Sequence, residues 1–89
     1  MPTVVFSGIL RRHLPVPDRT VDGTTVAAAL DAVFADAPRL RGYVLDDQGA
    51  LRRHVTVYVG ERAVGDRRGL SDPVAPADAI YVLQALSGG

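Results

Sequence analysis

The clearest alternation of hydrophobic and polar residues lies at positions 54–59, which read His-Val-Thr-Val-Tyr-Val. A strand turns successive side chains to opposite faces, so the three valines would point to one side, and His54, Thr56 and Tyr58 to the other. A Gly-Glu pair then predicts a turn into a short edge segment at 62–64. We therefore expect a strand here, followed by the edge of a sheet.

The same period of two marks a last strand, predicted at residues 79–85. Ile80 and Val82 would point into a core, and their neighbours along the strand would point outward. The residues after it, Leu-Ser-Gly-Gly, carry no such pattern. We expect them to form a flexible tail at 86–89.

The beginning of the chain predicts a hairpin. Residues 3–7 are mainly β-branched and aromatic, and residues 18–21 alternate between polar and apolar. Pro15 and Pro17 fall in the rather long loop between them, and an Asp-Gly pair ends the second segment. We expect the two segments to pair in antiparallel fashion.

A helical spacing follows the hairpin. Its apolar positions recur every three or four residues, at Val26, Leu30, Val33, Phe34 and Ala37. Asp31 and Asp36 would lie on the opposite, solvated face. Thr24 is the expected N-cap, and Pro38 is the expected end of the helix. After a connection at 39–42, an Asp-Asp-Gln-Gly run predicts a turn between two short segments at 43–45 and 51–53.

This order of elements predicts an α+β domain over residues 1–85. An amphipathic helix has to bury its apolar stripe, and the rest of the chain supplies strands for it to cover. We therefore expect a mixed sheet of four to five strands with one main helix packed across one face.

Composition narrows the classes of function. Ten basic residues balance ten acidic ones, so no positive excess favours nucleic acid. Cysteine is absent, which excludes thiolate chemistry, and the chain shows neither a signal-peptide pattern nor an apolar run long enough to span a membrane. We expect a cytoplasmic protein with no nucleic-acid or membrane partner. All ten basic residues are arginine, so the chain could receive an isopeptide bond only at its N-terminus.

No convincing catalytic or metal-binding set is found in the sequence. His13 and His54 have neither cysteine partners nor a zinc-site spacing. The acidic run at 46–49 lacks the length and the closing glutamate of a calcium loop. We therefore expect that the chain is not an enzyme and binds no metal or cofactor itself.

Four stretches carry a resemblance to a known family. They are Ile9–His13, His54–Val59, Gly69-Leu70 and Ala85–Gly89. With the order of elements, they resemble the β-grasp, or ubiquitin-like, fold. Within that fold the chain resembles the MoaD/ThiS-family sulfur carrier proteins, especially the CysO-like branch.

The resemblance implies a function at the C-terminal carboxylate of Gly89. In this family, an adenylating enzyme of the MoeB/ThiF type uses ATP to activate that carboxylate, and a sulfur donor converts it to a thiocarboxylate. The sulfur would then pass to a sulfur-accepting synthase, in the biosynthesis of cysteine, molybdopterin, thiamin or a sulfur-containing natural product. Because Gly88 and Gly89 have no Cβ, the tail could thread a narrow channel to the ATP.

A second candidate site lies on the predicted sheet. Tyr58, Tyr81 and Leu83, with Thr56 beside them, are expected on the face away from the helix. Exposed aromatic and aliphatic side chains there would anchor a partner enzyme, and Leu86 would extend this surface into the tail. Alternatively, these are ordinary half-buried strand residues.

Two other functions stay open. The activated Gly89 could acylate lysines of target proteins, as in a ubiquitin-like protein modifier. The chain could also be a β-grasp interaction module with an inert tail. A pool of free thiocarboxylate would favour the carrier, and lysine-linked adducts would favour the modifier.

Overall fold

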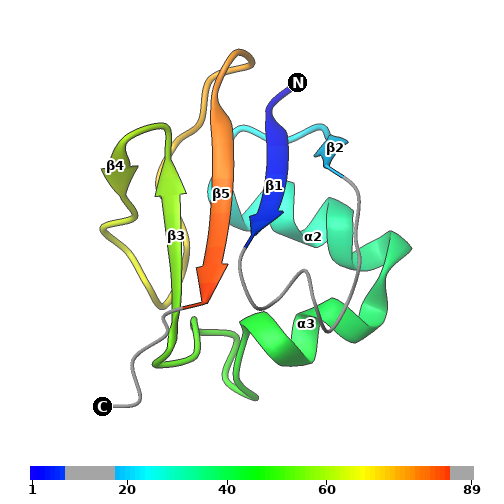
Figure 1. Ribbon diagram of the computed structural model, residues 1–89, viewed down its shortest axis with the longest axis vertical. Coiled ribbons are helices and arrows are strands. Elements are labelled where there is room, and N and C mark those ends of the chain that lie inside the picture. Colours follow the sequence, from blue (N-terminus) through cyan, green and yellow to red (C-terminus); the bar gives the residue numbers. More distant parts are fainter. Residues whose placement is uncertain (8–17, 85–89) are drawn as a thin grey trace.

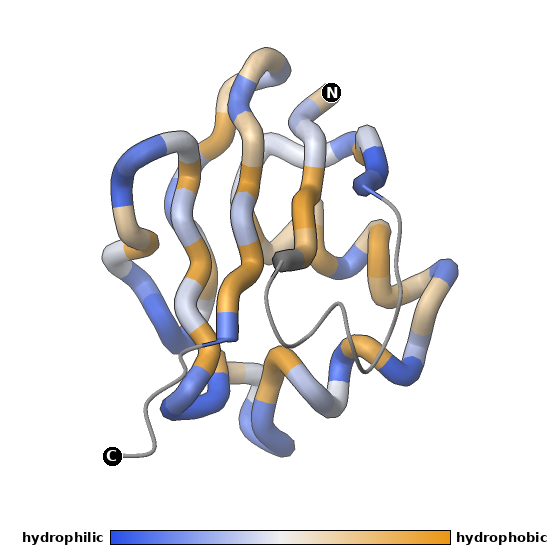
Figure 2. Tube along the Cα trace, in the orientation of Figure 1, coloured by the Kyte–Doolittle hydropathy of each residue, from blue (hydrophilic) through white to orange (hydrophobic). Residues whose placement is uncertain are grey.

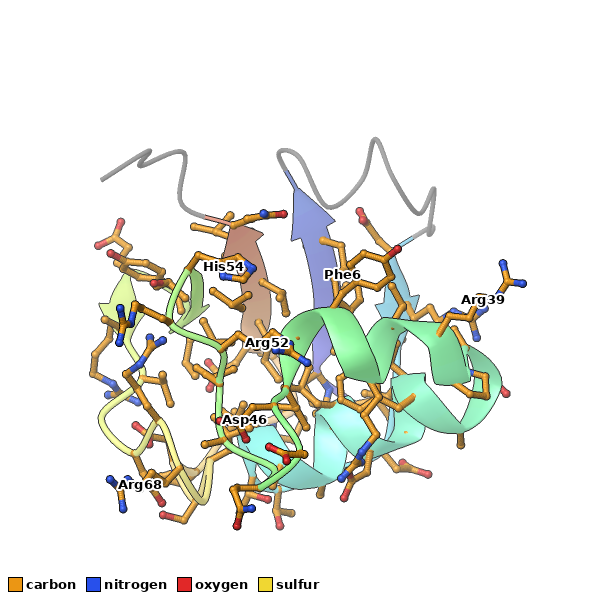
Figure 3. All side chains as sticks on the ribbon, turned by 90° about the horizontal axis from the view of Figure 1, so that it is seen from below. Phe6, Arg39, Asp46, Arg52, His54 and Arg68 are labelled. Atoms are coloured by element: carbon orange, nitrogen blue, oxygen red, sulfur yellow. The ribbon has the colours of Figure 1, made fainter. Side chains whose placement is uncertain are left out.

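The computed structural model describes residues 1–7 and 18–84, which form five strands and two helices (Figure 1). The strands are β1 (Thr3–Ser7), β2 (Arg19–Thr20), β3 (Val55–Val59), β4 (Arg62–Ala63) and β5 (Ala79–Gln84). The helices are α2 (Val26–Asp36) and α3 (Pro38–Val44). Both helices lie on one side of the sheet, and the opposite face carries no helix from the described part of the chain (Figures 1 and 3).

The sheet is mixed and has the strand order β2-β1-β5-β3-β4. β1 and β5 run parallel in its centre, and the other neighbouring strands are antiparallel. The hairpin expected at the beginning of the chain is present, since Thr3 pairs with Thr20. The first and last strands therefore lie side by side, and β5 is bordered by a strand on each side.

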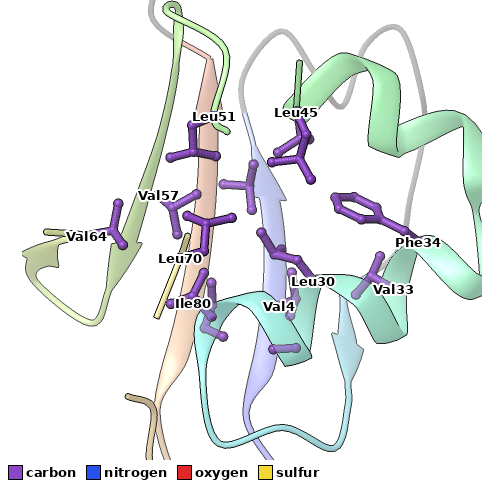
Figure 4. Close-up of a cluster of buried hydrophobic side chains, with 14 of the residues drawn as sticks. Val4, Leu30, Val33, Phe34, Leu45, Leu51, Val57, Val64, Leu70 and Ile80 are labelled. Atoms are coloured by element: carbon purple, nitrogen blue, oxygen red, sulfur yellow. The ribbon is translucent and has the colours of Figure 1, made fainter. Parts of the chain in front are cut away.

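Alternation along the strands separates a buried from an outer face, as the sequence predicts. In β3, Val55, Val57 and Val59 are buried. In β5, Ile80 and Val82 are fully buried. Figure 2 shows this alternation of hydropathy along the strands, and Figure 4 shows the inward side chains meeting the apolar side chains of the helical layer. Each buried aliphatic side chain contributes about 1.5–3 kcal/mol relative to exposure.

Helix α2 covers the sheet with the predicted apolar stripe. Val26, Leu30, Val33 and Phe34 are buried, and so is Ala29. The two aspartates at 31 and 36 are exposed, as predicted.

The N-cap of α2 is one residue later than predicted. It is Thr25 rather than Thr24, because Thr25 has extended backbone angles and its Oγ1 accepts a hydrogen bond from the Ala28 N–H at 3.1 Å. Two loop carbonyls accept the N–H groups of Val26 and Ala27. The first turn of the helix is thus fully hydrogen-bonded.

The connection predicted at 39–42 is wrong, because a second helix, α3, begins at Pro38. Ala37 leaves the helical region, with φ −136° and ψ 73°, and so separates the two helices. Proline suits the first position of a helix, where its missing N–H would have no partner within the helix. Leu40 and Val44 of α3 are buried and extend the core beyond α2.

Several expectations lie outside the described residues. These are the loop with Pro15 and Pro17, and the tail at 86–89. Within the described residues, none of the helices has the length and apolarity needed to cross a membrane.

Candidate functional site

The end of β5 is the first part of the candidate site. Gln84, the last described residue, is paired with Val55 at the start of β3, and Leu83 is paired with Ser7 at the end of β1. Residues 85–89 continue from this point, which we call the exit end. Leu86, Gly88 and Gly89 lie outside the described residues, so the structure gives the base of the tail but not the tail.

A turn at Arg52–Val55 borders the exit end. The Val55 N–H donates to the Arg52 carbonyl at 3.0 Å, and Arg53 and His54 are exposed at the tip. Nη2 of Arg67 donates to the carbonyls of Arg52, at 2.9 Å, and Val55, at 2.6 Å. The side chain of Arg67 therefore holds both ends of the turn in place. Figure 3 shows His54 beside the end of β5.

Four of the predicted docking residues come together on the outer face of the sheet. Tyr58 of β3 lies directly opposite Tyr81 of β5, and Thr56 lies opposite Leu83. Tyr81 is 37% exposed, while the other three are half-buried. A single exposed tyrosine therefore stands among half-buried neighbours, and the docking role of this surface stays a prediction.

The outer face includes one residue that the sequence reasoning missed. Val5 of β1 is paired with Tyr81 and is half-buried on the same side. Its neighbours Val4 and Phe6 are buried, so the period of two in β1 already placed Val5 outward. What the sequence did not provide was the parallel pairing that brings β1 next to β5.

The loop from Gly65 to Asp72 is tightly organised by its own carboxylates. The carboxylate of Asp66 accepts hydrogen bonds from the Ser71 hydroxyl, at 2.7 Å, and the Gly69 N–H, at 2.9 Å. These bonds, led by that from Ser71, lower the pKa of Asp66 from 3.8 to about 2. The Asp72 carboxylate accepts from the N–H groups of Gly65 and Asp66, which lowers its pKa as well.

This organisation places a leucine in the core. Leu70 is buried and has a φ of 54°, in the left-handed region that side chains rarely adopt. Its carbonyl accepts the Ala27 N–H at 2.9 Å, so the loop also helps to cap α2. The two carboxylates with lowered pKa therefore hold the shape of this loop.

A shallow depression of about 430 Å³ lies beside Asp46, Gln48, Ala50 and Arg68. Oδ1 of Asp46 already accepts hydrogen bonds from the N–H groups of Gln48 and Ala50. The run at 46–49 is therefore a turn closed by its own aspartate, as predicted. Within residues 1–7 and 18–84, no group of three acidic or histidine side chains is arranged to hold a metal ion.

Comparisons with known proteins agree with this architecture. The ThiS family model matches residues 4–89. The sulfur carrier protein CysO of Mycobacterium tuberculosis is 29% identical over 90 residues, covering 98% of this chain and 97% of the relative.

Two solved structures extend the comparison to the fold. One chain in the crystal structure of the Amycolatopsis orientalis BexX/CysO complex superposes with a TM-score of 0.82, at 27% identity over 100% of both chains. SAMP1 from Haloferax volcanii gives a TM-score of 0.78, at 27% identity over 99% of this chain and 98% of SAMP1. The β-grasp fold expected from the sequence is thereby confirmed.

Proposed function

This chain belongs to the ThiS family, and we propose that it is a sulfur carrier that works through the C-terminal carboxylate of Gly89. The similarity to CysO over nearly the whole chain supports this proposal. The chain itself would bind no cofactor and catalyse nothing, and its reactions would take place in partner enzymes of the cytoplasm, where ATP is available.

The proposed cycle has three chemical steps. A free carboxylate is a poor electrophile because its charge is delocalised and it has no good leaving group. In an activating enzyme of the MoeB/ThiF type, the carboxylate of Gly89 attacks ATP, which gives an acyl-adenylate and pyrophosphate. Hydrosulfide delivered by the donor then attacks the acyl carbon and AMP leaves, so that the chain ends in a thiocarboxylate. In a sulfur-accepting synthase the thiocarboxylate sulfur displaces a leaving group from the substrate, and water hydrolyses the resulting acyl–sulfur bond, which restores the carboxylate and leaves the sulfur on the product.

The observation that carries this proposal is the position of β5. This strand is paired with β1 on one side and β3 on the other, and it ends at Gln84, five residues before Gly89. Strands on both sides hold β5 in place up to Gln84. Gly88 and Gly89 have no side chain to obstruct a narrow channel. A strand held on both sides, followed by a terminus without side chains, suits delivery of a carboxylate into the active site of another protein.

We propose that the activating enzyme docks on the outer face of the sheet. Thr56 and Leu83 lie one residue from the Val55–Gln84 pair, and the two tyrosines lie two residues further along the strands. A partner that covers this face would therefore also surround the base of the tail, where Leu86 would add to the contact. The BexX/CysO complex supports the proposal that such a carrier binds partner proteins.

The test is the intact mass of the protein isolated from its native host. Replacement of one oxygen by sulfur at Gly89 would raise the mass of the C-terminal peptide by the difference between the two atoms. A chain that lacks Gly88 and Gly89 is the control, and it should show no such increment. The proposal fails if the native protein never carries the extra mass while cells are actively making sulfur metabolites.

The similarity to SAMP1, a small archaeal modifier protein, favours a second candidate function. The same activated Gly89 would then be transferred to lysine amines of target proteins. Lysine-linked adducts of the C-terminal peptide, found by mass spectrometry of whole lysate, would support this function. A pool of thiocarboxylate without such adducts would support the carrier function and contradict the modifier function.

A further inference from the structure

Four arginines gather beside the exit end. They form two adjacent pairs, Arg52-Arg53 and Arg67-Arg68, from two segments of the chain. The Leu51 N–H donates to the Arg67 carbonyl at 2.9 Å, and Nη2 of Arg67 donates to the Arg52 carbonyl at 2.9 Å. These two bonds bring the pairs together, and we call the four arginines the basic platform. The view from below in Figure 3 shows Arg52 and Arg68 on this side of the molecule.

Uncharged acceptors hold two guanidiniums of the platform. Nη2 of Arg67 also donates to the Val55 carbonyl at 2.6 Å, and Nε of Arg52 donates to the Gly42 carbonyl at 2.7 Å. A carbonyl satisfies an N–H group but does not neutralise the positive charge. Both of these side chains are half-buried. Because their hydrogen bonds already restrict them, they would lose little conformational entropy when a partner binds.

The positive charge of the platform is not neutralised by a carboxylate of the described chain. Within residues 1–7 and 18–84, none of its four guanidiniums lies within ion-pair distance of an acidic side chain. The carboxylates of Asp46 and Asp66, which lie nearby, accept hydrogen bonds from N–H groups of their own loops instead. Like charges gathered in this way repel one another, so carboxylates from outside the chain would be attracted to them.

Most of the acidic residues belong to other parts of the chain. Residues 41–55 and 67–68 contain five of the ten arginines but only two of the ten acidic residues. The net charge of zero therefore conceals a positive region at the exit end. The long phosphate backbone of a nucleic acid would extend past this region towards acidic ones, whereas an acidic patch on a protein has a matching size.

We propose that the basic platform binds an acidic surface of the activating enzyme. The platform adjoins the outer face of the sheet, since Val55 is paired with Gln84 and is followed by Thr56. An enzyme that covers the outer face would therefore meet the platform as well. Guanidiniums bind carboxylates through paired N–H donors, and complementary charges speed association. The proposal rests on the proposed function and deepens it, because it adds a charged contact to the same partner.

The test removes two charges from the platform and leaves its hydrogen bonds in place. The variant is Arg53→Gln/Arg68→Gln, because both side chains are exposed and neither donates the bonds described above. The control, Arg39→Gln/Arg62→Gln, removes the same charge from two other exposed positions. Arg39 is in the first turn of α3, away from the platform in Figure 3. Arg62 lies on β4, roughly 13 Å along β3 from the exit end.

ATP–pyrophosphate exchange with the adenylating enzyme of the host gives kcat and KM for each chain, in NaCl from about 10 mM to about 300 mM. At the lowest salt we expect the platform variant to raise KM roughly tenfold with kcat unchanged, because the charges act on association. The Debye length falls from about 30 Å to below about 10 Å over this range, so the difference should shrink to about twofold. The control variant should stay within about twofold of the unchanged chain. Arg53→Lys/Arg68→Lys keeps both charges and should recover most of the loss.

Melting curves establish that each variant is folded. Equal increases in KM for the platform and control variants would overturn the inference, since net charge alone would then explain them. So would a platform effect that persists undiminished at high salt. Binding of a short RNA that the platform variant loses, with adenylation unaffected, would assign the platform to nucleic acid instead. Failure of the proposed function would look different, as an unchanged chain that is not adenylated at any salt concentration.

Discussion

Tyr58 and Tyr81 lie directly opposite one another on β3 and β5, on the face of the sheet that the helices leave uncovered. Such cross-strand aromatic pairs stabilise a sheet by about 0.2–1 kcal/mol. Tyr81 is the more exposed of the two, and it lies between Tyr58 and Val5 in one row across three strands. This row therefore offers an aromatic side chain to a partner close to the exit end.

Tyr81→Ser should weaken recognition by the activating enzyme and leave the core intact. Loss of an aromatic anchor at an interface commonly costs more than 1 kcal/mol, so we expect the KM for adenylation to rise roughly tenfold. ATP–pyrophosphate exchange with the adenylating enzyme of the host measures this. Tyr43→Ser is the matched control, because Tyr43 is an exposed tyrosine on α3, in the helical layer. Equal effects of the two changes would exclude the outer face as the docking surface.

Gly89→Ala should impair activation without changing the melting temperature. The added methyl group would meet the wall of the channel that the tail enters, and it also restricts the backbone angles of the last residue. We expect at least a tenfold loss of adenylation. Ser87→Ala, in the same tail, should keep nearly full activity. Normal adenylation of Gly89→Ala would contradict the role assigned to the terminal glycines.

The loop carboxylates should make the protein sensitive to acid. The pKa of Asp66 is about 2 in the folded chain, against an ordinary value of 3.8. A carboxyl with a lowered pKa stabilises the fold above pH 4, and that stabilisation is lost as the pH falls from about 4 towards 2. The melting temperature should fall over this range, and less steeply in Asp66→Asn. Asp47→Asn, in an exposed turn, should keep the steep fall of the unchanged chain.

Leu30→Ala should destabilise the fold by about 2–5 kcal/mol, because it leaves a cavity between α2 and the sheet. Leu30 is only 1% exposed, and alanine is a good helix former, so the loss would come from packing. Urea denaturation measures the effect. Asp31→Ala, at the next position, removes only an exposed ion pair with Arg41 and should change stability by less than about 1 kcal/mol. A small effect at position 30 would mean that the core closes around the gap.

Sequence patterns predicted the parts of the fold that depend on regular periodicity. The alternation in β3 and β5 correctly predicted which valines are buried. The apolar stripe of α2 correctly predicted the main helix. Pro38 was correctly predicted to end the first helix, since α2 stops at Asp36. Its second role, as the first residue of α3, was missed, because the apolar spacing from Leu40 to Val44 is short. The inward position of Leu70 was not visible, since a single leucine within a polar loop has no period.

The candidate site was predictable in its residue types but not in its arrangement. The terminal glycines and the outward tyrosines follow from the sequence and from the family resemblance. The registers that put Tyr58 opposite Tyr81, and Val5 beside them, depend on contacts between distant segments, which one sequence does not fix. The same holds for Arg67, whose two hydrogen bonds across the turn at Arg52–Val55 join segments twelve or more residues apart.

The pairing of β1 with β5 has a consequence for how the chain is made. Until residues 79–84 leave the ribosome, β1 and β3 have no common neighbour. Without β5 the sheet would consist of two separate strand pairs, β2-β1 and β3-β4. Long-range pairings of this kind form slowly, and the sheet should close only once β5 is available. A chain broken off before β5 would remain open to proteases. Only a chain that includes β5 can therefore present the assembled outer face to a partner enzyme.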